Sequence, residues 1–328
     1  MRLTHRAIEA LRRERGRSIS LFITDRCQVG CGHCSVDSRA DSPTIENFDR
    51  FAKILDWIAR QPELEVVSIT GGEPFVERRG LALTTRRLGA AGKLLAVYTS
   101  GVWGFGARIP GWIHDVLARC DCVYLSTDAY HAEIIDDASL INAAREIAAA
   151  EAWLVLQVLD VEPAREQAGE LLNRAFGGRW DQHAEINVVS PVRYGRGESL
   201  VIPSTPVEGR SFGPCPLLQS PVIRYDGAIS ACSNDGVIMG LGPARLRRRG
   251  RSPAELDDVL AVLQADPALR VIGDAGFCAL TRHSKLRDLA EQSFSTNCEL
   301  CWKALDRLPS GRDPELDALT TPTIDEDP

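Results

Sequence analysis

The first two thirds of the chain alternate short apolar runs with longer amphipathic segments. Six runs of strand length, rich in β-branched residues, are each followed by a stretch with helical periodicity. Several runs are apolar almost throughout, as is typical of strands covered on both faces. This order predicts parallel strands joined by crossover helices. The predicted strands are residues 18–24, 65–70, 93–99, 122–127, 153–159 and 185–190.

The segment between the first two runs shows the helical pattern best. Its apolar residues recur three or four positions apart and would form one stripe against the sheet. They are Ile45, Phe48, Phe51, Leu55 and Ile58.

Polar and glycine-rich residues follow each predicted strand. In barrels of parallel strands, the loops after the strands converge on one rim, where reactive groups gather. We therefore expect one site at that rim. Its candidate segments are 24–37, 71–74, 99–101, 126–131, Gln157 and 187–191.

The alternation stops after Pro191, and a turn-rich region follows. The "YDG" sequence at 225–227 predicts a hairpin, and Ser252 followed by proline predicts a helix that ends near residue 265. The arginine-rich stretch 245–251 is interpreted as a solvated loop. The acidic, proline-rich stretch 308–328 predicts a disordered tail.

Composition and charge limit the class of protein. A net charge of −7 argues against a general nucleic-acid binder, because a large phosphate footprint needs a basic surface. No run is long enough to cross a membrane, and the N-terminus does not resemble a signal peptide. We therefore expect a cytoplasmic protein, in which clustered cysteines favour metal or redox chemistry over disulfides.

Three of the ten cysteines, Cys27, Cys31 and Cys34, form a C-x3-C-x2-C stretch after the first strand. Soft thiolates select zinc, copper(I) or iron-sulfur clusters. A structural zinc site needs a fourth ligand, and His33 is adjacent to Cys34, where both side chains would rarely reach one ion. Three thiolates on a four-iron cluster would instead leave one iron open.

This cysteine spacing, followed by a second strand that ends in "GGEP", resembles the radical S-adenosylmethionine (SAM) superfamily. The resemblance covers residues 18–191 and implies a partial (β/α)6 TIM barrel, an α/β fold preceded by an N-terminal helix at 1–17. It implies that Cys27, Cys31 and Cys34 hold a [4Fe-4S] cluster whose open iron binds SAM. Reductive cleavage would then give a 5′-deoxyadenosyl radical that abstracts hydrogen from a substrate.

The resemblance also implies residues that contact SAM. The "GGEP" motif would bind the methionyl ammonium, His33 occupies a position that often touches adenine, and three residues at strand ends match polar contacts to SAM. Caps and turns remain the alternative interpretation for these three. No catalytic role is assigned to Tyr130 or His131. The predicted SAM-binding residues are Gly71, Gly72, Glu73, Pro74, His33, Ser126, Asp128 and Gln157.

Four later cysteines lie in the region 192–307, which resembles the small α+β "twitch" region, a relative of the SPASM domain. That resemblance implies a second, auxiliary [4Fe-4S] cluster, although a four-thiolate zinc site would use the same ligands. Cys278 is interpreted as a buried thiol outside the ligand set, and Cys120 and Cys122 as core residues. The implied ligands are Cys215, Cys232, Cys298 and Cys301.

Enzymes of this kind modify ribosomal peptides or dehydrogenate small molecules such as aminoglycoside intermediates. The first strand begins by Ser18, which leaves no room before it for a winged-helix precursor-binding domain. We favour an oxidoreductase that crosslinks, oxidises or epimerises a peptide, with ferredoxin or flavodoxin as reductant and a separate leader-binding protein as a further partner. The different-class alternatives are a non-catalytic iron-sulfur electron carrier and a zinc-stabilised binding module.

Overall fold

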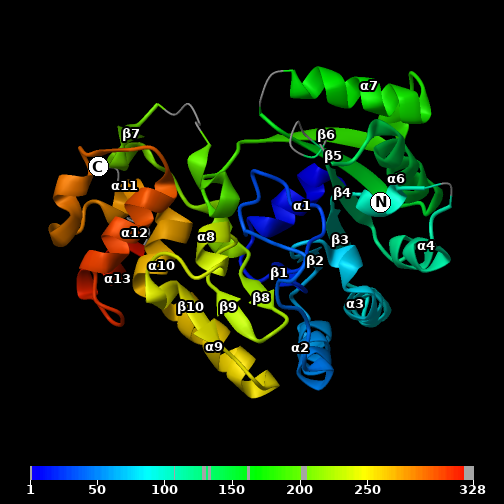
Figure 1. Ribbon diagram of the computed structural model, residues 1–328. Helices are drawn as coiled ribbons and strands as arrows, with labels where there is room; N and C mark the ends of the chain where they lie inside the picture. The colour runs from blue at the N-terminus through cyan, green and yellow to red at the C-terminus, as the bar shows by residue number, and fades with distance from the viewer. Residues whose placement is uncertain are drawn as a thin grey trace, which may run out of the picture. The chain divides into compact units, whose positions relative to one another are not determined.

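The computed structural model describes residues 2–106, 108–127, 131, 134–160, 163–200 and 205–320. The chain forms two compact units (Figure 1). The first comprises Met1–Ile202 and Val222–Ala228, and the second comprises Pro203–Pro221 and Ile229–Pro328. The predicted boundary after residue 191 therefore falls inside the first unit, which also takes in a short piece of the later chain.

The first unit is built on a parallel sheet. All six predicted strands are present, and each pairs in parallel with the next along the chain. A seventh strand, β8 (Val222–Arg224), pairs in parallel with the other edge of β1. The six are β1 (Ser18–Phe22), β2 (Val66–Thr70), β3 (Leu94–Thr99), β4 (Cys122–Ser126), β5 (Trp153–Leu159) and β6 (Ala184–Val189).

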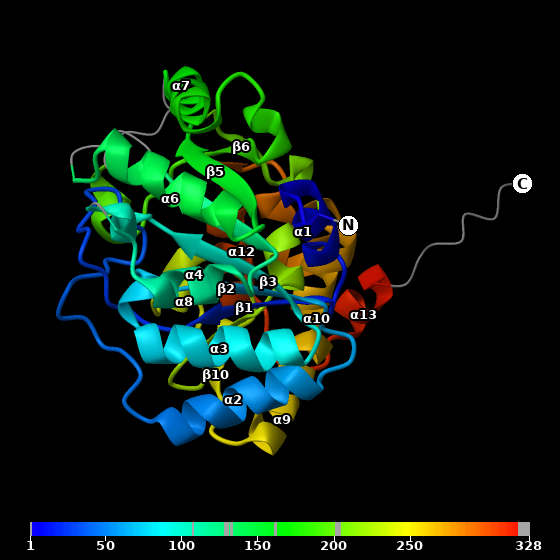
Figure 2. The same ribbon diagram turned by 90° about the vertical axis from the view of Figure 1, so that its right-hand side faces the viewer.

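Crossover helices cover the outer face of this sheet (Figure 2). Three of them, α2, α3 and α6, begin after a side chain that accepts a backbone N–H group, that of Asn47, Glu77 and Asp136 respectively. Of the predicted stripe, Phe51, Leu55 and Ile58 are buried on α2, Phe48 at its first position is half-buried, and Ile45 is buried ahead of the helix. The helices are α2 (Phe48–Arg60), α3 (Arg78–Ala90), α4 (Gly111–Leu117), α6 (Asp137–Ala149) and α7 (Ala164–Phe176).

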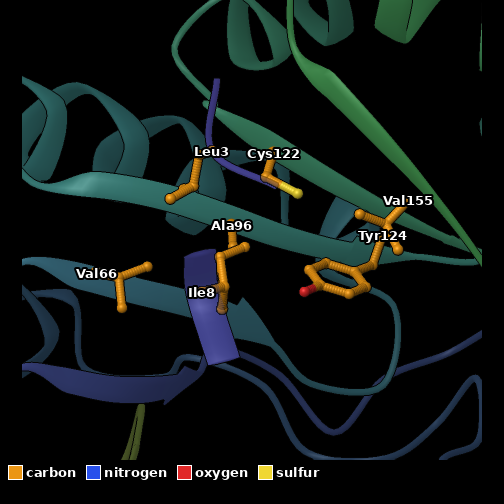
Figure 3. Packing of buried hydrophobic residues seen from close by; sticks show 7 residues of the cluster. All are labelled: Leu3, Ile8, Val66, Ala96, Cys122, Tyr124 and Val155. Carbon is orange, nitrogen blue, oxygen red and sulfur yellow. The ribbon is translucent and has the colours of Figure 1, made fainter. Parts of the chain in front are cut away.

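The N-terminal helix α1 (His5–Arg12) packs against the inner face of the sheet. Figure 3 shows Ile8 of this helix against Ala96 and close to Tyr124, in a cluster of buried apolar residues from four strands. Tyr124 also stacks on Tyr98, with ring centroids 4.2 Å apart. The other members of the cluster are Leu3, Val66, Cys122 and Val155.

Polar contacts fix the start of α1 over the same core. The Nδ1 atom of His5 and the hydroxyl of Tyr124 form a hydrogen bond at 2.9 Å, and the backbone N–H of His5 donates to the carboxylate of Glu185 at 2.6 Å. Glu185 also accepts from the Trp153 indole at 2.7 Å. Since Trp153 and Glu185 lie at the beginnings of β5 and β6, α1 fills the sheet interior from the end opposite to the predicted site.

The second unit consists of short elements around its own apolar core. β7 (Val207–Glu208) pairs antiparallel with β11 (Ser293–Phe294), and β9 (Ala228–Ser230) neighbours β10 (Arg247–Arg249). Phe277, Leu286 and Leu300 are fully buried there. The helices are α8 (Asp235–Ile238), α9 (Pro253–Ala265), α10 (Pro267–Arg270), α11 (Phe277–Leu280), α12 (Asn297–Arg307) and α13 (Pro314–Thr320).

Two local predictions for the later chain are confirmed. The "YDG" turn lies between β8 and β9, where the N–H of Gly227 donates to the carbonyl of Arg224 at 2.9 Å. Gly227 has a φ of 85°, a left-handed conformation that glycine adopts at no steric cost. Helix α9 begins after Ser252, whose side chain accepts from the N–H of Glu255.

Two other predictions for the later chain are wrong in part. Arg245 is not solvated: it is buried, and its guanidinium pairs with Asp266 at 2.6 Å, while residues 247–249 form β10. The predicted disordered tail contains α13, in which Leu316 is fully buried. Residues 321–328 lie outside the described part of the chain. Across the described residues, no helix has the length and apolar character needed to cross a membrane.

The packing of α1 generates a first prediction. Ile8→Ala should lower the free energy of unfolding by about 2–5 kcal/mol, because it leaves a cavity at a fully buried position between α1 and the sheet. Chemical denaturation monitored by circular dichroism measures the change. Arg6→Ala, at an exposed position of the same helix, should change it by less than about 0.5 kcal/mol. Equal effects of both substitutions would contradict this role for α1.

Candidate functional site

The three predicted cluster ligands lie in one loop after β1. Two backbone hydrogen bonds close the loop. The N–H of Cys27 donates to the carbonyl of Arg39 at 3.0 Å, and the N–H of Cys34 donates to the carbonyl of Cys31 at 3.3 Å. Cys31 is buried, and Cys27 and Cys34 are half-buried. The sequence therefore folds the three thiols into a compact, partly desolvated loop at the carboxyl end of the first strand.

Backbone N–H groups are directed at two of these sulfur atoms. Burial raises the pKa of the Cys27 thiol to about 11, whereas hydrogen bonds from the N–H groups of Val29 and Gly30 act in the opposite direction. The N–H of Ser38 donates to the Cys34 sulfur at 3.4 Å. N–H donors favour a sulfur that carries negative charge, so these contacts suit thiolates that ligate an iron-sulfur cluster.

The "GGEP" motif at the end of β2 is joined to the same loop by backbone contacts. The N–H of Gly72 donates to the carbonyl of Thr24 at 2.7 Å, and the N–H of Glu73 donates to the carbonyl of Arg26 at 2.8 Å. A Cβ atom on Gly71 would collide with the backbone of Thr24, and one on Gly72 with that of Arg26. The two glycines are needed because the two backbones approach this closely.

Glu73 is buried, and its carboxylate is held by four donors. It accepts from the N–H and hydroxyl of Ser100 at 2.8 and 2.6 Å, from the hydroxyl of Thr99 at 2.8 Å and from the N–H of Phe75 at 3.1 Å. Burial raises the pKa of Glu73, and these hydrogen bonds counteract that effect. The carboxylate thus joins the end of β2 to the end of β3. Pro74 is also buried, at the start of a 3₁₀ turn.

The other predicted SAM contacts lie at neighbouring strand ends or in the loop. Ser126 and Gln157 are register partners on β4 and β5, both half-buried, and Gln157 accepts from Asn187 at 3.2 Å. His33 meets His131 edge to face, with ring centroids 5.1 Å apart. Asp128 lies outside the described residues. The contacts of the remaining residues with SAM stay predictions.

A buried ion pair that the sequence did not reveal lies just before the first cysteine of the loop. Arg224 of β8 donates to both carboxylate oxygens of Asp25, at 2.9 and 2.7 Å, and the hydroxyl of Tyr225 donates to the same carboxylate at 2.8 Å. The side chains of Arg224 and Asp25 are only 14% and 10% exposed. Because Asp25 stands two residues before Cys27, the pairing of β8 with β1 fixes the direction in which the loop leaves the strand.

The four predicted auxiliary ligands form a separate set within the second unit. Burial raises the pKa of the Cys301 thiol well above its usual value, and the thiols of Cys232, Cys215 and Cys298 raise it further. The other three thiols therefore lie within electrostatic reach of Cys301. Cys298 and Cys301 come from the first turns of α12, three residues apart and so on one side of the helix.

N–H donors surround these sulfur atoms as well. Asn234 donates its side-chain amide to Cys298 at 3.3 Å, and Asn297 donates to Cys215 at 3.6 Å. The backbone N–H of Asn234 also bonds to Cys232, whose pKa burial raises to about 12. These buried thiols with N–H donors suit a metal or cluster bound by four thiolates.

Cys278 differs from the four predicted auxiliary ligands. Its side chain is exposed, which contradicts the prediction of a buried thiol. Cys120 and Cys122 are buried, as the core interpretation requires. Among the described residues, no set of three or more Cys, His, Asp or Glu side chains already has the geometry of a metal site.

Comparison with known proteins identifies the fold class. Residues 21–150, within the first unit, match the model of the radical SAM superfamily, and this match implies SAM and a [4Fe-4S] cluster. YydG, a proposed peptide biosynthesis protein of Bacillus subtilis (strain 168), is 24% identical over 128 residues, which are 38% of this chain and 40% of YydG. The match thus spans about two fifths of that relative.

Solved structures show the same fold at low identity. SuiB of Streptococcus suis bound to S-adenosylmethionine has a TM-score of 0.52 at 13% identity, over 79% of this chain and 68% of SuiB. Native anSMEcpe with bound AdoMet and the Cp18Cys peptide has a TM-score of 0.50 at 12% identity, over 88% of this chain and 95% of that one. The partial-barrel fold predicted from the sequence is confirmed.

The ion pair at the loop entrance generates a second prediction. Arg224→Ala should lower the free energy of unfolding by about 3 kcal/mol, because it leaves the carboxylate of Asp25 buried without its cation. Urea denaturation measures the effect. Arg174→Ala removes an ion pair with Asp137 whose side chains are 55% and 54% exposed, and it should cost at most about 1 kcal/mol. A cost for Arg224→Ala no larger than for Arg174→Ala would refute the proposed role of the buried pair.

Proposed function

We propose that this protein is a radical SAM oxidoreductase that modifies a ribosomally synthesised peptide. The observation that carries the proposal is the cysteine loop at the end of β1, joined by backbone hydrogen bonds to the "GGEP" motif at the end of β2. Both segments lie within the stretch that matches the radical SAM superfamily. An electron carrier or a zinc-stabilised module has no need of the second motif.

In this proposal Cys27, Cys31 and Cys34 hold the [4Fe-4S] cluster, supported by the N–H groups directed at the loop sulfurs. Bound together, the cluster and SAM supply a 5′-deoxyadenosyl radical for hydrogen abstraction. The glycine motif allows a ligand close access to backbone groups. His33, Ser126 and Gln157 would contact the remainder of SAM.

The peptide substrate is supported by what the similar proteins are described as binding or making. YydG is described in terms of peptide biosynthesis, and SuiB has been solved with its precursor peptide SuiA, at a TM-score of 0.53 and 13% identity. A small molecule such as an aminoglycoside intermediate is the competing substrate class. The modification would be a crosslink, an oxidation or an epimerisation, each of which begins with loss of a hydrogen atom from the peptide.

The proposed reaction needs partners and a reducing compartment. A ferredoxin or flavodoxin would supply the electron that reduces the SAM-binding cluster, whose potential would lie in the lower part of the iron-sulfur range of about −700 to +450 mV. A separate leader-binding protein could present the precursor peptide. A cytoplasmic location would keep the ten cysteines reduced.

The third prediction tests the radical SAM assignment. Anaerobically reconstituted and reduced protein should convert SAM to methionine and 5′-deoxyadenosine, as measured by chromatography and mass spectrometry. Cys31→Ala should abolish this cleavage, because it removes one of three cluster ligands. Cys278→Ala, which removes an exposed thiol outside both ligand sets, should leave the rate within about twofold.

Other outcomes of this experiment separate the alternatives. Protein that contains zinc but no iron, or that never yields 5′-deoxyadenosine, would refute the assignment. Where cleavage occurs, deuterated peptide and small-molecule candidates can be compared by the transfer of deuterium into 5′-deoxyadenosine. Transfer only from a small molecule would overturn the peptide substrate while leaving the radical SAM assignment intact.

We further propose that Cys215, Cys232, Cys298 and Cys301 hold an auxiliary [4Fe-4S] cluster. Complete thiolate ligation leaves no iron open to substrate, so this cluster would serve to transfer electrons. The closeness of the four sulfurs and the asparagine donors around them support the site. A four-thiolate zinc ion is the competing occupant.

The fourth prediction distinguishes the two occupants. Cys298→Ala should lower the iron and sulfide content by about four atoms each per chain, while the SAM-binding cluster stays in place. Metal analysis and sulfide determination on the reconstituted protein provide the measurement. Loss of one zinc at constant iron would establish the zinc site instead. Cys278→Ala again serves as the matched thiol control.

A further inference from the structure

The segment that follows β6 folds back onto the cysteine loop within the first unit. It contains a 3₁₀ turn, Gly195–Ser199, and the backbone N–H of Arg196 donates to the carbonyl of Cys34 at 3.0 Å. A Cβ on Gly195 would collide with the carbonyls of Cys34 and Ser35. The sequence suggested only a turn-rich region here, yet this turn is packed directly on the predicted cluster ligands.

The side chain of Arg196 makes three further contacts with the same loop. Its Nε donates to the carbonyl of Cys31 at 2.8 Å, and its Nη1 donates to the carbonyl of Ser38 at 2.9 Å and to the carboxylate of Asp37 at 2.8 Å. The side chain is 20% exposed. One guanidinium thus connects both ends of the segment from Cys31 to Ser38, and this segment contains the third cysteine.

The loop conformation needs such a contact. Asp37 has a φ of 47°, in the left-handed region that residues other than glycine seldom occupy. Its carboxylate also pairs with Arg39, but the Arg39 side chain is 61% exposed, so that contact is weak. Arg196 is the better shielded partner, and it is the one that also binds the backbone on both sides of Cys34.

We propose that Arg196 is a positioning residue for the SAM-binding cluster, which holds the three-cysteine loop in shape and sets a fixed positive charge beside it. The inference rests on the proposed function for the identity of the cluster. A fixed cation next to a negatively charged cluster favours the reduced form, and hydrogen bonds around the ligands tune the potential. Arg196 therefore raises the reduction potential of this cluster relative to a loop without the cation.

The first arm of the fifth prediction uses the protein without a cluster. Arg196→Gln should accelerate hydrogen exchange of the amides between Cys31 and Ser38 by about tenfold or more, because charge-assisted hydrogen bonds to this segment are lost. Arg174→Gln, which removes an exposed ion pair elsewhere in the same unit, should leave these amides unchanged. Equal exchange in both variants would overturn the inference whether or not a cluster binds.

The second arm uses the reconstituted protein and a readout that mere support of the fold would not move. In a redox titration followed by electron paramagnetic resonance, Arg196→Gln should shift the potential of the SAM-binding cluster to more negative values. Arg196→Lys keeps the cation but loses the three-way contact, so the cluster potential in this variant should lie closer to the wild-type value than that in Arg196→Gln. Measuring both variants in a Cys298→Ala background keeps the auxiliary site from contributing.

The outcomes of the two arms are distinguishable. A potential unchanged in Arg196→Gln would overturn the inference even if exchange were faster. Wild-type protein that binds no cluster would refute the proposed function, while the exchange experiment would still report whether Arg196 holds the loop. Reduced iron content in Arg196→Gln, restored in Arg196→Lys, supports the positioning role where the glutamine variant loads too poorly for titration.

Discussion

The close approach of two backbones, at Thr24–Arg26 and at Gly71–Glu73, is the constraint on which the site depends. Two hydrogen bonds join them, and no side chain fits between them at either glycine. The contact fixes the start of the cysteine loop relative to the end of β2. The buried carboxylate of Glu73 extends it to β3 through Thr99 and Ser100. Three strand ends are thereby held as one rigid edge, from which the loop can present its thiols.

The rest of the loop is held by arginines from much later in the chain. Arg224, on β8, binds Asp25 before the first cysteine, and Arg196 binds the segment that contains the last two. The contacts of β8 and Arg224 with β1 and Asp25 explain why residues 222–228 belong to the first unit, although residues 203–221, which precede them, belong to the second. A loop with three thiols and several exposed carbonyls has little apolar surface to bury, so charged hydrogen bonds have to fix its shape.

The sequence predicted those features that local pattern determines. Strands β1 to β6 were evident as short runs rich in apolar and β-branched residues, and those covered on both faces, such as β1, are apolar almost throughout. Strand β8 has only three residues, and its parallel pairing with β1 is a contact between positions about two hundred residues apart, which no local periodicity encodes. The same reason hid Arg196, which binds two backbone carbonyls and the carboxylate of Asp37 about 160 residues earlier in the chain. Arg245 looked solvated because its partner, Asp266, lies beyond the arginine run.

The gradient of polarity along the sheet shows why the site lies at one end of it. At the starts of the strands, α1 closes the interior with an apolar cluster around Ile8 and Tyr124. Toward the other end, β4 finishes in the half-buried Ser126, whose register partner on β5 is the half-buried Gln157. Strand β6 is half-buried over all but its first residue, whereas β4 is buried until its last, so the sheet becomes more accessible toward its last strand. This accessibility follows from the position of β6 at the edge of the sheet, whereas β1 and β2, which carry the cysteine loop and the glycine motif, each have a neighbouring strand on both sides.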